Sequence, residues 1–293
     1  MTLTIFTPTF NRAYRLPDLY ESLCRQSCKE FEWIVVDDGS TDDTERLFKE
    51  WLSESSFTIK YIKQPNGGKH RAINRGVKEA KGEFFFIVDS DDKLTSDAVE
   101  TILNYANQIR DDEHCGGVIG FRVYPDGKRI GGEVANFKPM RCTRFDFRHK
   151  YNVKGDLAEV FKTTVMKEYP FPEYAGEKFC PEAYVWEDMA MRYDFLFFCK
   201  GTYVCEYLED GLTNHIDQVR IKSPRGSAEC YVICHKAPVP LKIKIKDSIN
   251  YWRFRFHCKN DIKPDVIISP WALPLGWLFY KRDCFKYPEI CKK

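Results

Sequence analysis

The sequence of 293 residues is long enough for one large α/β domain, or for one domain with a smaller appendage. Hydrophobic residues make up 43% of the chain, which is sufficient for a buried core. Because 45 basic residues nearly balance 43 acidic ones, the chain lacks the strongly positive field of a general nucleic-acid-binding protein.

Twelve cysteines are scattered along the chain without a C-x-x-C pair, so a zinc finger or ribbon is not expected. Cys230, Cys234 and His235 come nearest to a metal-binding spacing, but we do not expect them to bind an ion. The opening residues contain neither a basic n-region nor an apolar h-region, and no apolar run approaches the ~20 residues that span a bilayer. Free thiols in a reducing cytosol are therefore expected.

The first hundred residues alternate between strand and helix patterns. Short apolar runs predict strands at 2–7, 31–36, 57–62 and 84–88, and apolar residues at helical spacing predict helices near 16–23, 47–52, 72–80 and 99–106. Strands separated by helices of this length predict a mostly parallel sheet with right-handed crossovers. Ligands bind such sheets beyond the carboxyl ends of the strands, so the polar clusters after the first, second and fourth strands should converge there.

The second half of the sequence is less regular. We predict a strand at 116–124 with a hairpin turn at 124–128, helices at 156–166 and 186–198, and a strand at 202–208. Beyond about residue 211 the pattern changes to basic and aromatic segments.

An acidic cluster, Asp89-Ser90-Asp91-Asp92, directly follows the fourth predicted strand. Carboxylates on such a rigid platform suit a divalent cation that neutralises the diphosphate of a nucleotide-sugar as it leaves. Two other interpretations are open: a solvated acidic turn, and a phosphatase of the haloacid dehalogenase type. The phosphatase is disfavoured because Lys93 stands where a Thr or Val is expected, and because that site usually opens the chain.

Five ordered blocks together closely resemble the donor half of family 2 glycosyltransferases, in particular those that build bacterial capsular, exopolysaccharide or other cell-surface glycans. The blocks are Thr7–Arg12, Trp33–Asp42, Asn66–Lys69 with Asn74-Arg75-Gly76, Ala80–Glu83, and Asp89–Asp92. The resemblance implies an inverting enzyme with a GT-A fold, a Rossmann-like, mostly parallel sheet flanked by helices. It implies a catalytic domain at 1–210, with the donor half at 1–110 and the acceptor half at 111–210, and a helical extension at 211–293.

The resemblance also implies roles for individual residues. The expected nucleotide-sugar contacts are Thr7 and Pro8 through their backbone, Asn11, Arg12, Asp38, Lys69, Asn74, Asp89 and Ser90; the expected ligands of Mn²⁺ or Mg²⁺ are Asp91, Asp89 and Asp92. A carboxylate at Asp38 accepts the imide N–H of uracil or thymine, which favours a UDP-sugar or dTDP-sugar. Taken alone, Asp37-Asp38 would be an N-cap pair and Lys69 a solvated surface lysine. Thr7-Pro8-Thr9 lacks the glycines of a dinucleotide turn, which disfavours an NAD enzyme.

Inverting transfer needs a carboxylate that removes the proton of the acceptor hydroxyl. In the family this base belongs to an acidic pair that opens a helix, and Glu187-Asp188 lies at a fitting distance along the chain. We favour Asp188, with Glu187 second and Glu182 third; the alternative is an acidic first turn stabilised by the helix dipole. The segments 176–186 and 209–213 resemble a polysaccharide-synthesis subgroup in which some members lack a clear acidic pair.

No Q-x-x-R-W follows, which disfavours a processive, membrane-embedded synthase. We therefore predict transfer of a single sugar from a nucleotide-sugar to a glycan or lipid-linked hydroxyl. A non-catalytic nucleotide-sugar-binding module is the main rival, and phosphoryl chemistry at Asp89 is a weaker one. The basic-aromatic segments 241–259 and 271–280 suit either contact with an anionic bilayer or ordinary packing. The expected location is cytoplasmic, with peripheral contact to the inner face of the membrane left open, as is a homodimer.

Overall fold

The computed structural model describes residues 2–206, 215–259 and 264–291, and these form two compact units. The first unit holds the described residues up to 67, together with 72–170 and 192–206. The second holds 68–71, 171–191 and the described residues from 215 onward. The predicted boundary at 210/211, the segment 209–213 and the end of the predicted strand 202–208 lie outside the described residues, and the functional division of the chain stays a prediction.

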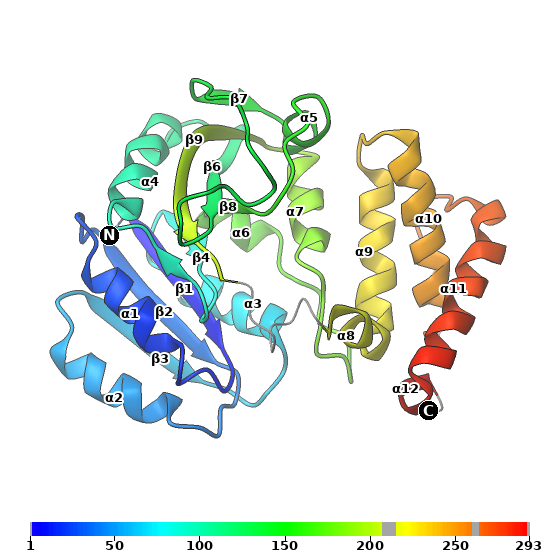
Figure 1. Cartoon of the computed structure of the whole chain (residues 1–293), viewed down its shortest axis with the longest axis horizontal. Coiled ribbons are helices and arrows are strands. Elements are labelled where there is room, and N and C mark those ends of the chain that lie inside the picture. Colours follow the sequence, from blue (N-terminus) through cyan, green and yellow to red (C-terminus); the bar gives the residue numbers. More distant parts are fainter. Residues whose placement is uncertain (1, 207–214, 260–263, 292–293) are drawn as a thin grey trace. The chain divides into compact units, whose positions relative to one another are not determined.

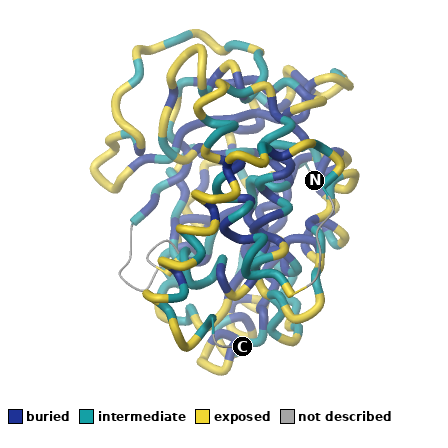
Figure 2. Tube along the Cα trace, turned by 90° about the vertical axis from the view of Figure 1, so that its right-hand side faces the viewer, coloured by how far each residue is buried: buried dark blue, intermediate teal, exposed yellow. Residues whose placement is uncertain are grey.

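Four parallel strands form the first half of the sheet in the order β3-β2-β1-β4 (Figure 1). They are β1 (Leu3–Thr9), β2 (Phe31–Asp37), β3 (Thr58–Lys63) and β4 (Phe84–Ile87). Every residue of β1, β2 and β4 is buried, as expected for strands covered on both faces (Figure 2). All four predicted strands are thus confirmed.

Helices connect and cover these strands. They are α1 (Leu16–Cys24), α2 (Thr44–Glu54), α3 (Lys69–Glu79) and α4 (Ala98–Ala106), and they match the predicted helices. On one face of the sheet, Tyr20 stacks on Trp51 with ring centroids 4.3 Å apart, and both lie next to Trp33 of β2. This aromatic packing fixes α1 and α2 against the strands that end in the acidic motifs.

The sheet continues beyond β4 as a mixed sheet in the order β4-β8-β6-β9-β5, with β7 paired to β9. The strands are β5 (Lys93–Leu94), β6 (Cys115–Val123), β7 (Met140–Cys142), β8 (Leu157–Lys162) and β9 (Asp194–Val204), joined by the short helices α5 (Arg144–His149) and α6 (Thr163–Glu168). Strand β6 pairs parallel to β9, whereas β8 is antiparallel to both β4 and β6. The predicted strand at 116–124 and the turn after it are confirmed by β6 and by the Tyr124–Lys128 backbone hydrogen bond.

Two helix predictions in this region are wrong over most of their length. Residues 157–162 of the predicted helix 156–166 form strand β8, and only its last turn is helical. The predicted helix 186–198 ends at Ala190, because residues from Asp194 onward enter strand β9. Both segments are short and largely buried, and periodicity alone does not distinguish such a strand from a buried helix.

The second unit is helical. It contains α7 (Ala183–Ala190), α8 (Ile216–Lys222), α9 (Pro224–Lys236), α10 (Leu241–Arg255), the 3-10 turn η3 (Pro270–Ala272), α11 (Leu273–Lys286) and α12 (Pro288–Cys291). Its core comprises Ile221, Ala228, Val232, Tyr251, Phe254 and Ile268. The helical character expected for the C-terminal region is therefore confirmed. None of the helices in the described part of the chain is both long and apolar enough to cross a membrane.

Candidate functional site

The loops after β1, β2 and β4 lie next to one another because β1 pairs with both other strands in parallel. The Asp38 N–H donates to the Thr9 carbonyl at 2.8 Å, and the Val88 N–H donates to the Phe6 carbonyl at 2.8 Å. The backbone therefore brings the motif that contains Asp38 and the motif that contains Asp89 to adjacent positions on one edge of the sheet, as the sequence predicted.

Asn11 joins the first of these loops to the second. Its Oδ1 accepts from the Thr41 N–H at 2.8 Å, and its own N–H donates to Ser40 Oγ at 2.8 Å. Asn11 has a φ of 52°, a left-handed conformation that asparagine tolerates better than most residues. The Asn11 side chain thus holds the loop in shape, and any nucleotide contact by it would come in addition to that role.

Thr7 and Pro8 are buried within β1. Thr7 Oγ1 accepts from Trp33 Nε1 at 3.0 Å, so the Thr7 side chain belongs to the core. A contact between Thr7 and a nucleotide would have to use the backbone, which is the form in which the resemblance implied it.

The two neighbouring aspartates at the end of β2 have different partners. Asp37 is fully buried; its Oδ1 accepts from the Ser40 N–H at 2.7 Å and its Oδ2 accepts from the Tyr61 hydroxyl. Burial, followed by this hydrogen bond to Asp37, raises the pKa of the Tyr61 hydroxyl. Asp37 therefore stabilises the fold rather than a ligand.

Asp38 connects β2 to the loop that precedes α3. Its Oδ1 accepts from Gln64 Nε2 at 2.8 Å and from the Gly67 N–H at 2.9 Å. These two hydrogen bonds fix the orientation of the carboxylate. The helix-cap alternative is not observed, since the N-cap residue of α2 is Asp43.

The start of α3 belongs to the second unit, where it is held by the segment before α7. Lys69 Nζ lies 2.8 Å from Glu182 Oε1, and the Arg71 guanidinium donates to the carbonyls of Tyr174 and Glu177. Gly68 has a φ of +99°, and a Cβ there would lie 1.9 Å from the Lys178 carbonyl oxygen. Lys69 is thus ion-paired rather than simply solvated. Asn74, the remaining predicted contact on α3, is buried.

The acidic cluster after β4 is organised by Tyr203 of β9, which is completely buried. The Tyr203 hydroxyl donates to Asp92 Oδ2 at 2.8 Å and accepts from the Asp89 N–H at 2.9 Å. The Arg122 guanidinium of β6 lies over the Tyr203 ring, 4.2 Å from its centroid. Burial, together with the charges of Asp89 and Asp91, raises the pKa of Asp92 to about 7. Tyr203 and Arg122 were not predicted, because nothing in their local sequence marks them.

Asp91 is more accessible than Asp92 and lies beside basic groups. Arg12 Nη2 is 4.0 Å from Asp91 Oδ2, and Arg15 Nη2 donates to the Asp91 carbonyl at 3.4 Å. Arg15 also pairs with Glu206 at 2.9 Å. Arg12 and Asp91, predicted from separate motifs, are therefore brought together. Ser90, which lies between Asp89 and Asp91 in the sequence, is buried.

The chemistry of these oxygen donors fits Mg²⁺ or Mn²⁺. Carboxylates are hard ligands. The pKa of Asp92 is raised first by burial and then by the negative charges of Asp89 and Asp91, which a dication would offset. Within the described residues, however, the one set of three His, Cys, Asp or Glu ligand atoms close enough to share an ion lies elsewhere in the chain. The cluster is therefore not a preassembled three-carboxylate cage, and an ion here would take one or two carboxylates plus substrate oxygens.

The three candidate bases lie in the second unit and differ in their surroundings. Glu182 is the residue before α7 and pairs with Lys69. Glu187 and Asp188 lie in the second turn of α7, so the expectation that they open a helix, and with it the dipole alternative, is wrong. The pKa of Asp247 of α10 is raised to about 6, mainly by burial, and the negative charge of Glu187 contributes to this increase. Burial also raises the pKa of Asp188, a shift that Lys236 opposes.

A family model described as glycosyl transferase family 2 matches residues 4–164. The chain belongs to this family. The matched region contains β1 to β4, both acidic motifs and the antiparallel strand β8.

Curated relatives of this family 2 chain act in bacterial glycan synthesis. It is 39% identical over 202 residues to the GalNAc(5)-diNAcBac-PP-undecaprenol beta-1,3-glucosyltransferase of Campylobacter jejuni, an alignment that covers 66% of this chain and 61% of the relative. It is 28% identical over 178 residues to the poly(ribitol-phosphate) beta-N-acetylglucosaminyltransferase TarS of Staphylococcus aureus, covering 59% of this chain and 30% of TarS. The chain thus spans less than two thirds of each of these relatives.

Solved structures show that this family 2 member has the GT-A fold. The crystal structure of S. aureus TarS residues 1–349 in complex with UDP superposes with a TM-score of 0.61 at 20% identity, covering 88% of this chain and 73% of that one. The mannosyltransferase PcManGT of Pyrobaculum calidifontis, in complex with GDP-Man and Mn²⁺, superposes with a TM-score of 0.56 at 18% identity, covering 97% and 75%.

Proposed function

We propose that this chain is an inverting glycosyltransferase that moves one sugar from a UDP-sugar to a hydroxyl of a lipid-linked glycan. The observation that carries the proposal is the adjacency of the Asp38 motif and the Asp89–Asp92 cluster across β1. The first motif suits a base that offers an imide N–H, and the second suits a diphosphate with its cation. Support also comes from the family match and from TarS, which was crystallised with UDP.

In this proposal each loop has a separate task. Asp38, oriented by Gln64 and Gly67, accepts a hydrogen bond from the uracil. Asp91, with Asp89, supplies oxygen ligands for Mn²⁺ or Mg²⁺, which neutralises the diphosphate. Arg12, 4.0 Å from Asp91, adds positive charge where the diphosphate would lie. Asp92, whose carboxyl is buried against Tyr203, holds the loop and does not bind the ion directly.

We propose Asp188 as the base that takes the proton of the acceptor hydroxyl. Its pKa is raised by burial, which brings it closer to the range in which a carboxylate is an effective base. Glu182 is less suited because its carboxylate is already paired with Lys69. Glu187 is less suited because its charge acts on Asp247 within the helical unit.

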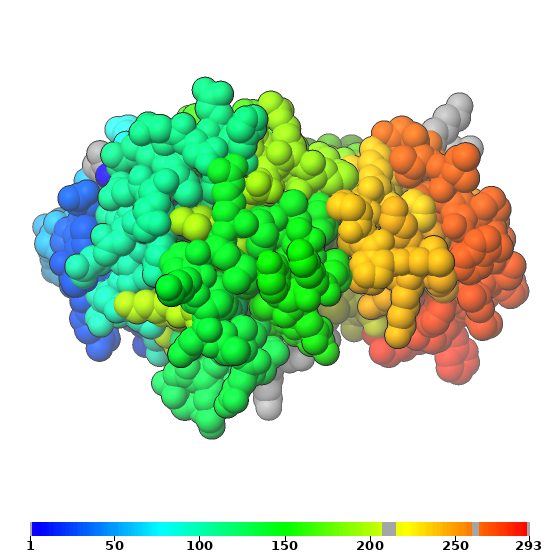
Figure 3. Space-filling view, turned by 90° about the horizontal axis from the view of Figure 1, so that it is seen from above, coloured from blue at the N-terminus to red at the C-terminus, as the bar shows by residue number. Residues whose placement is uncertain are grey.

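We further propose that α11 lies on an anionic bilayer. Trp271 in the turn η3 and Leu275, Leu278 and Phe285 in α11 recur at spacings of four, three and seven residues and are 56, 44, 59 and 90% exposed. Arg282 continues this stripe, Lys281 and Lys286 flank it, and all three are exposed. The orange-to-red segment that contains α11 contributes to the surface in Figure 3. Exposed apolar and basic side chains on one helix face suit the headgroup region, where a lipid-linked acceptor resides.

A nucleotide panel tests donor binding. The melting temperature should rise with UDP plus Mn²⁺ more than with UDP alone, and GDP, CMP and dTDP show whether Asp38 selects the base. Asp91→Ala should abolish the Mn²⁺-dependent part of the shift. Asp126→Ala, at an exposed turn where the carboxylate pairs with Lys128, is the matched control and should keep it. Indifference of the wild-type protein to every nucleotide contradicts the proposal.

Kinetics with a glycan acceptor test the base. Asp188→Asn should lower kcat by 10²-fold or more, the scale of general base catalysis, while the UDP-dependent melting shift stays unchanged. Glu187→Gln is the neighbouring control, and its kcat should stay within a few fold of wild type. A non-catalytic binding module predicts no turnover by the wild-type protein and no effect of Asp188→Asn.

Sedimentation with lipid vesicles tests the membrane contact. The protein should bind vesicles that contain phosphatidylglycerol, and binding should weaken with salt and with Leu278→Glu. Leu52→Glu, at a leucine of α2 that is 51% exposed, should bind as wild type. Equal binding of all three proteins, or of none, rejects this surface as the contact.

A further inference from the structure

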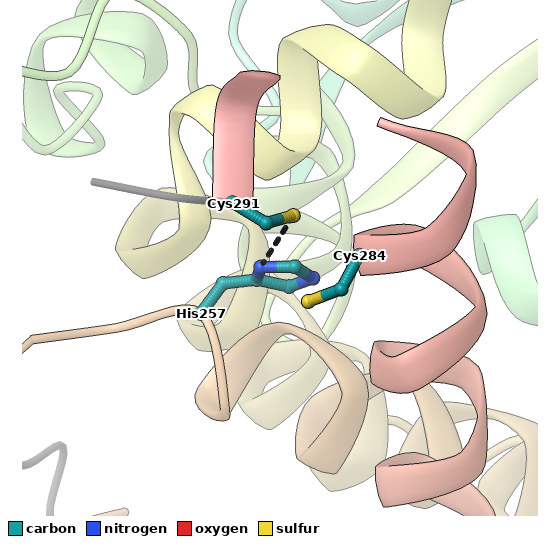
Figure 4. Close-up of side chains that lie close together, drawn as sticks. All are labelled: His257, Cys284 and Cys291. Carbon is teal, nitrogen blue, oxygen red and sulfur yellow. Dashed lines mark hydrogen bonds between the residues drawn. The ribbon is translucent and has the colours of Figure 1, made fainter. Parts of the chain in front are cut away.

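A cluster of soft metal ligands lies in the helical unit, and neither the family nor the proposed reaction accounts for it. It consists of His257 just after α10, Cys284 on α11 and Cys291 at the end of α12 (Figure 4). One ligand atom of each residue lies within 4.8 Å of the other two. Cys291 Sγ lies 3.9 Å from His257 Nδ1. We propose that these three residues bind Zn²⁺, independently of sugar transfer.

The histidine is already oriented as a metal ligand. His257 Nε2 lies 3.3 Å from Asp283 Oδ2, and only 5% of the His257 side chain is exposed. Because a carboxylate accepts the proton on Nε2, the lone pair of Nδ1 is available to a metal ion on the side of Cys291 Sγ. Metal-binding histidines typically donate their other ring nitrogen to a carboxylate in this manner.

Asp283 is itself held in place. Both of its oxygens accept from the Arg253 guanidinium, at 2.5 and 2.8 Å, and its side chain is 1% exposed. Arg253 also pairs with Asp217 of α8 at 3.1 Å. A buried carboxylate that is itself fixed by an arginine therefore holds the orientation of the His257 ring.

Geometry and charge both select zinc. Tetrahedral Zn²⁺ with bonds of about 2.3 Å to sulfur and 2.0–2.1 Å to nitrogen separates two sulfurs by roughly 3.8 Å and a sulfur from a nitrogen by roughly 3.6 Å. Movements of about 1 Å or less bring the present atoms to those separations. Two thiolates and a neutral imidazole make a neutral site with one dication, which suits a half-buried position. Water would complete the coordination, and the ion would tie together α10, α11 and α12.

Metal analysis of the intact protein tests the site. Protein purified without chelator and dialysed against Zn²⁺ should hold about one zinc per chain, and Co²⁺ substituted for it should give the thiolate-to-cobalt charge-transfer band and the visible bands of a tetrahedral site. Cys284→Ser, Cys291→Ser and His257→Gln should each lower the zinc content at least tenfold. Asp283→Asn, which alters the partner of His257 Nε2 and leaves the three proposed ligands in place, should weaken zinc binding 10–100-fold while the cobalt spectrum keeps its thiolate band.

Cys258→Ser is the matched control, because Cys258 follows His257 but its thiol donates to the Phe254 carbonyl, and its zinc content should equal that of wild type. Circular dichroism of each metal-free variant separates loss of binding from loss of folding. A wild-type protein that remains zinc-free after this dialysis overturns the proposal, as does zinc that persists in the Cys284→Ser, Cys291→Ser double variant. An intact mass two hydrogens lower, with Cys284 and Cys291 joined as a disulfide, would overturn it in favour of a redox pair.

Discussion

Replacing Asp92 with asparagine should change how the stability of the protein depends on pH. Asparagine keeps an oxygen that accepts from the Tyr203 hydroxyl, so the hydrogen bond observed at 2.8 Å can persist. What disappears is the ionisable group, whose pKa is raised to about 7 by burial and by the nearby charges of Asp89 and Asp91. The experiment therefore removes a buried charge while largely keeping the packing around it.

The size and sign of the effect follow from proton linkage. An unfolded aspartate has a pKa near ~3.9, so between about pH 4 and pH 7 the unfolded chain has lost this proton while the folded protein retains it. The free energy of unfolding then falls as pH rises, by about 1.4 kcal/mol per pH unit at most. Over the roughly three units between the two pKa values, the wild-type protein loses up to about 4 kcal/mol that the variant does not lose.

Urea denaturation at pH 5, 6, 7 and 8, with chelator present, measures the difference between the two proteins. Asp188 and Asp247 also have raised pKa values, but they titrate in both proteins and cancel in the comparison. The variant should become relatively more stable as pH rises. In a separate series without chelator, Mn²⁺ should stabilise the wild type more at pH 8 than at pH 5. Identical pH profiles for the two proteins would refute the reasoning that Asp92 is a buried, crowded carboxyl.

Three further substitutions probe separate parts of the fold. Tyr203→Phe leaves the Asp89 N–H and the Asp92 carboxyl without this hydroxyl, and should lower the free energy of unfolding by about 1–3 kcal/mol in the same denaturation assay. Gly276→Leu should destabilise the helical unit by about 1–3 kcal/mol or more, because even a Cβ there would lie 2.3 Å from that of Trp252; limited proteolysis should cut α11 faster. Asp37→Asn should lower the melting temperature with little change in UDP affinity, whereas Asp38→Asn should do the reverse; equal effects of the two would contradict the division of roles drawn from their hydrogen bonds.

Local sequence patterns were sufficient to predict the strands and helices of the first half of the fold. The predictions failed where the spacing of apolar residues fits a helix and a strand equally well. The strand Phe84–Ile87 and the acidic residues after it are adjacent in the chain, so both were predicted together. Segment 157–162 is also a short run but contains Glu159 and Lys162, and its pattern predicts a helix because a run this short is compatible with either a helical or a strand period. Only its antiparallel pairing with β4 and β6, which depends on the whole sheet, determines its conformation.

The site shows the same limit at the level of side chains. Arg12 and Asp91 were expected near one another because both follow parallel strands, and the structure brings them together. Tyr203, however, approaches Asp92 from a strand more than a hundred residues away. The cluster of His257, Cys284 and Cys291 joins three helices with irregular spacing, so no linear motif announces it. Contacts set by tertiary packing alone leave no such local signal.

The two acidic motifs follow one structural logic, and this logic separates scaffold from ligand. In each motif a buried aspartate accepts from a tyrosine hydroxyl that another strand supplies: Asp37 from Tyr61 of β3, and Asp92 from Tyr203 of β9. A buried carboxylate with a fixed hydrogen-bond donor is costly to move, so it sets the position of the residues beside it. Its neighbour then presents a carboxylate in a defined direction. We propose on this argument that Asp38 and Asp91, rather than Asp37 and Asp92, bind the donor.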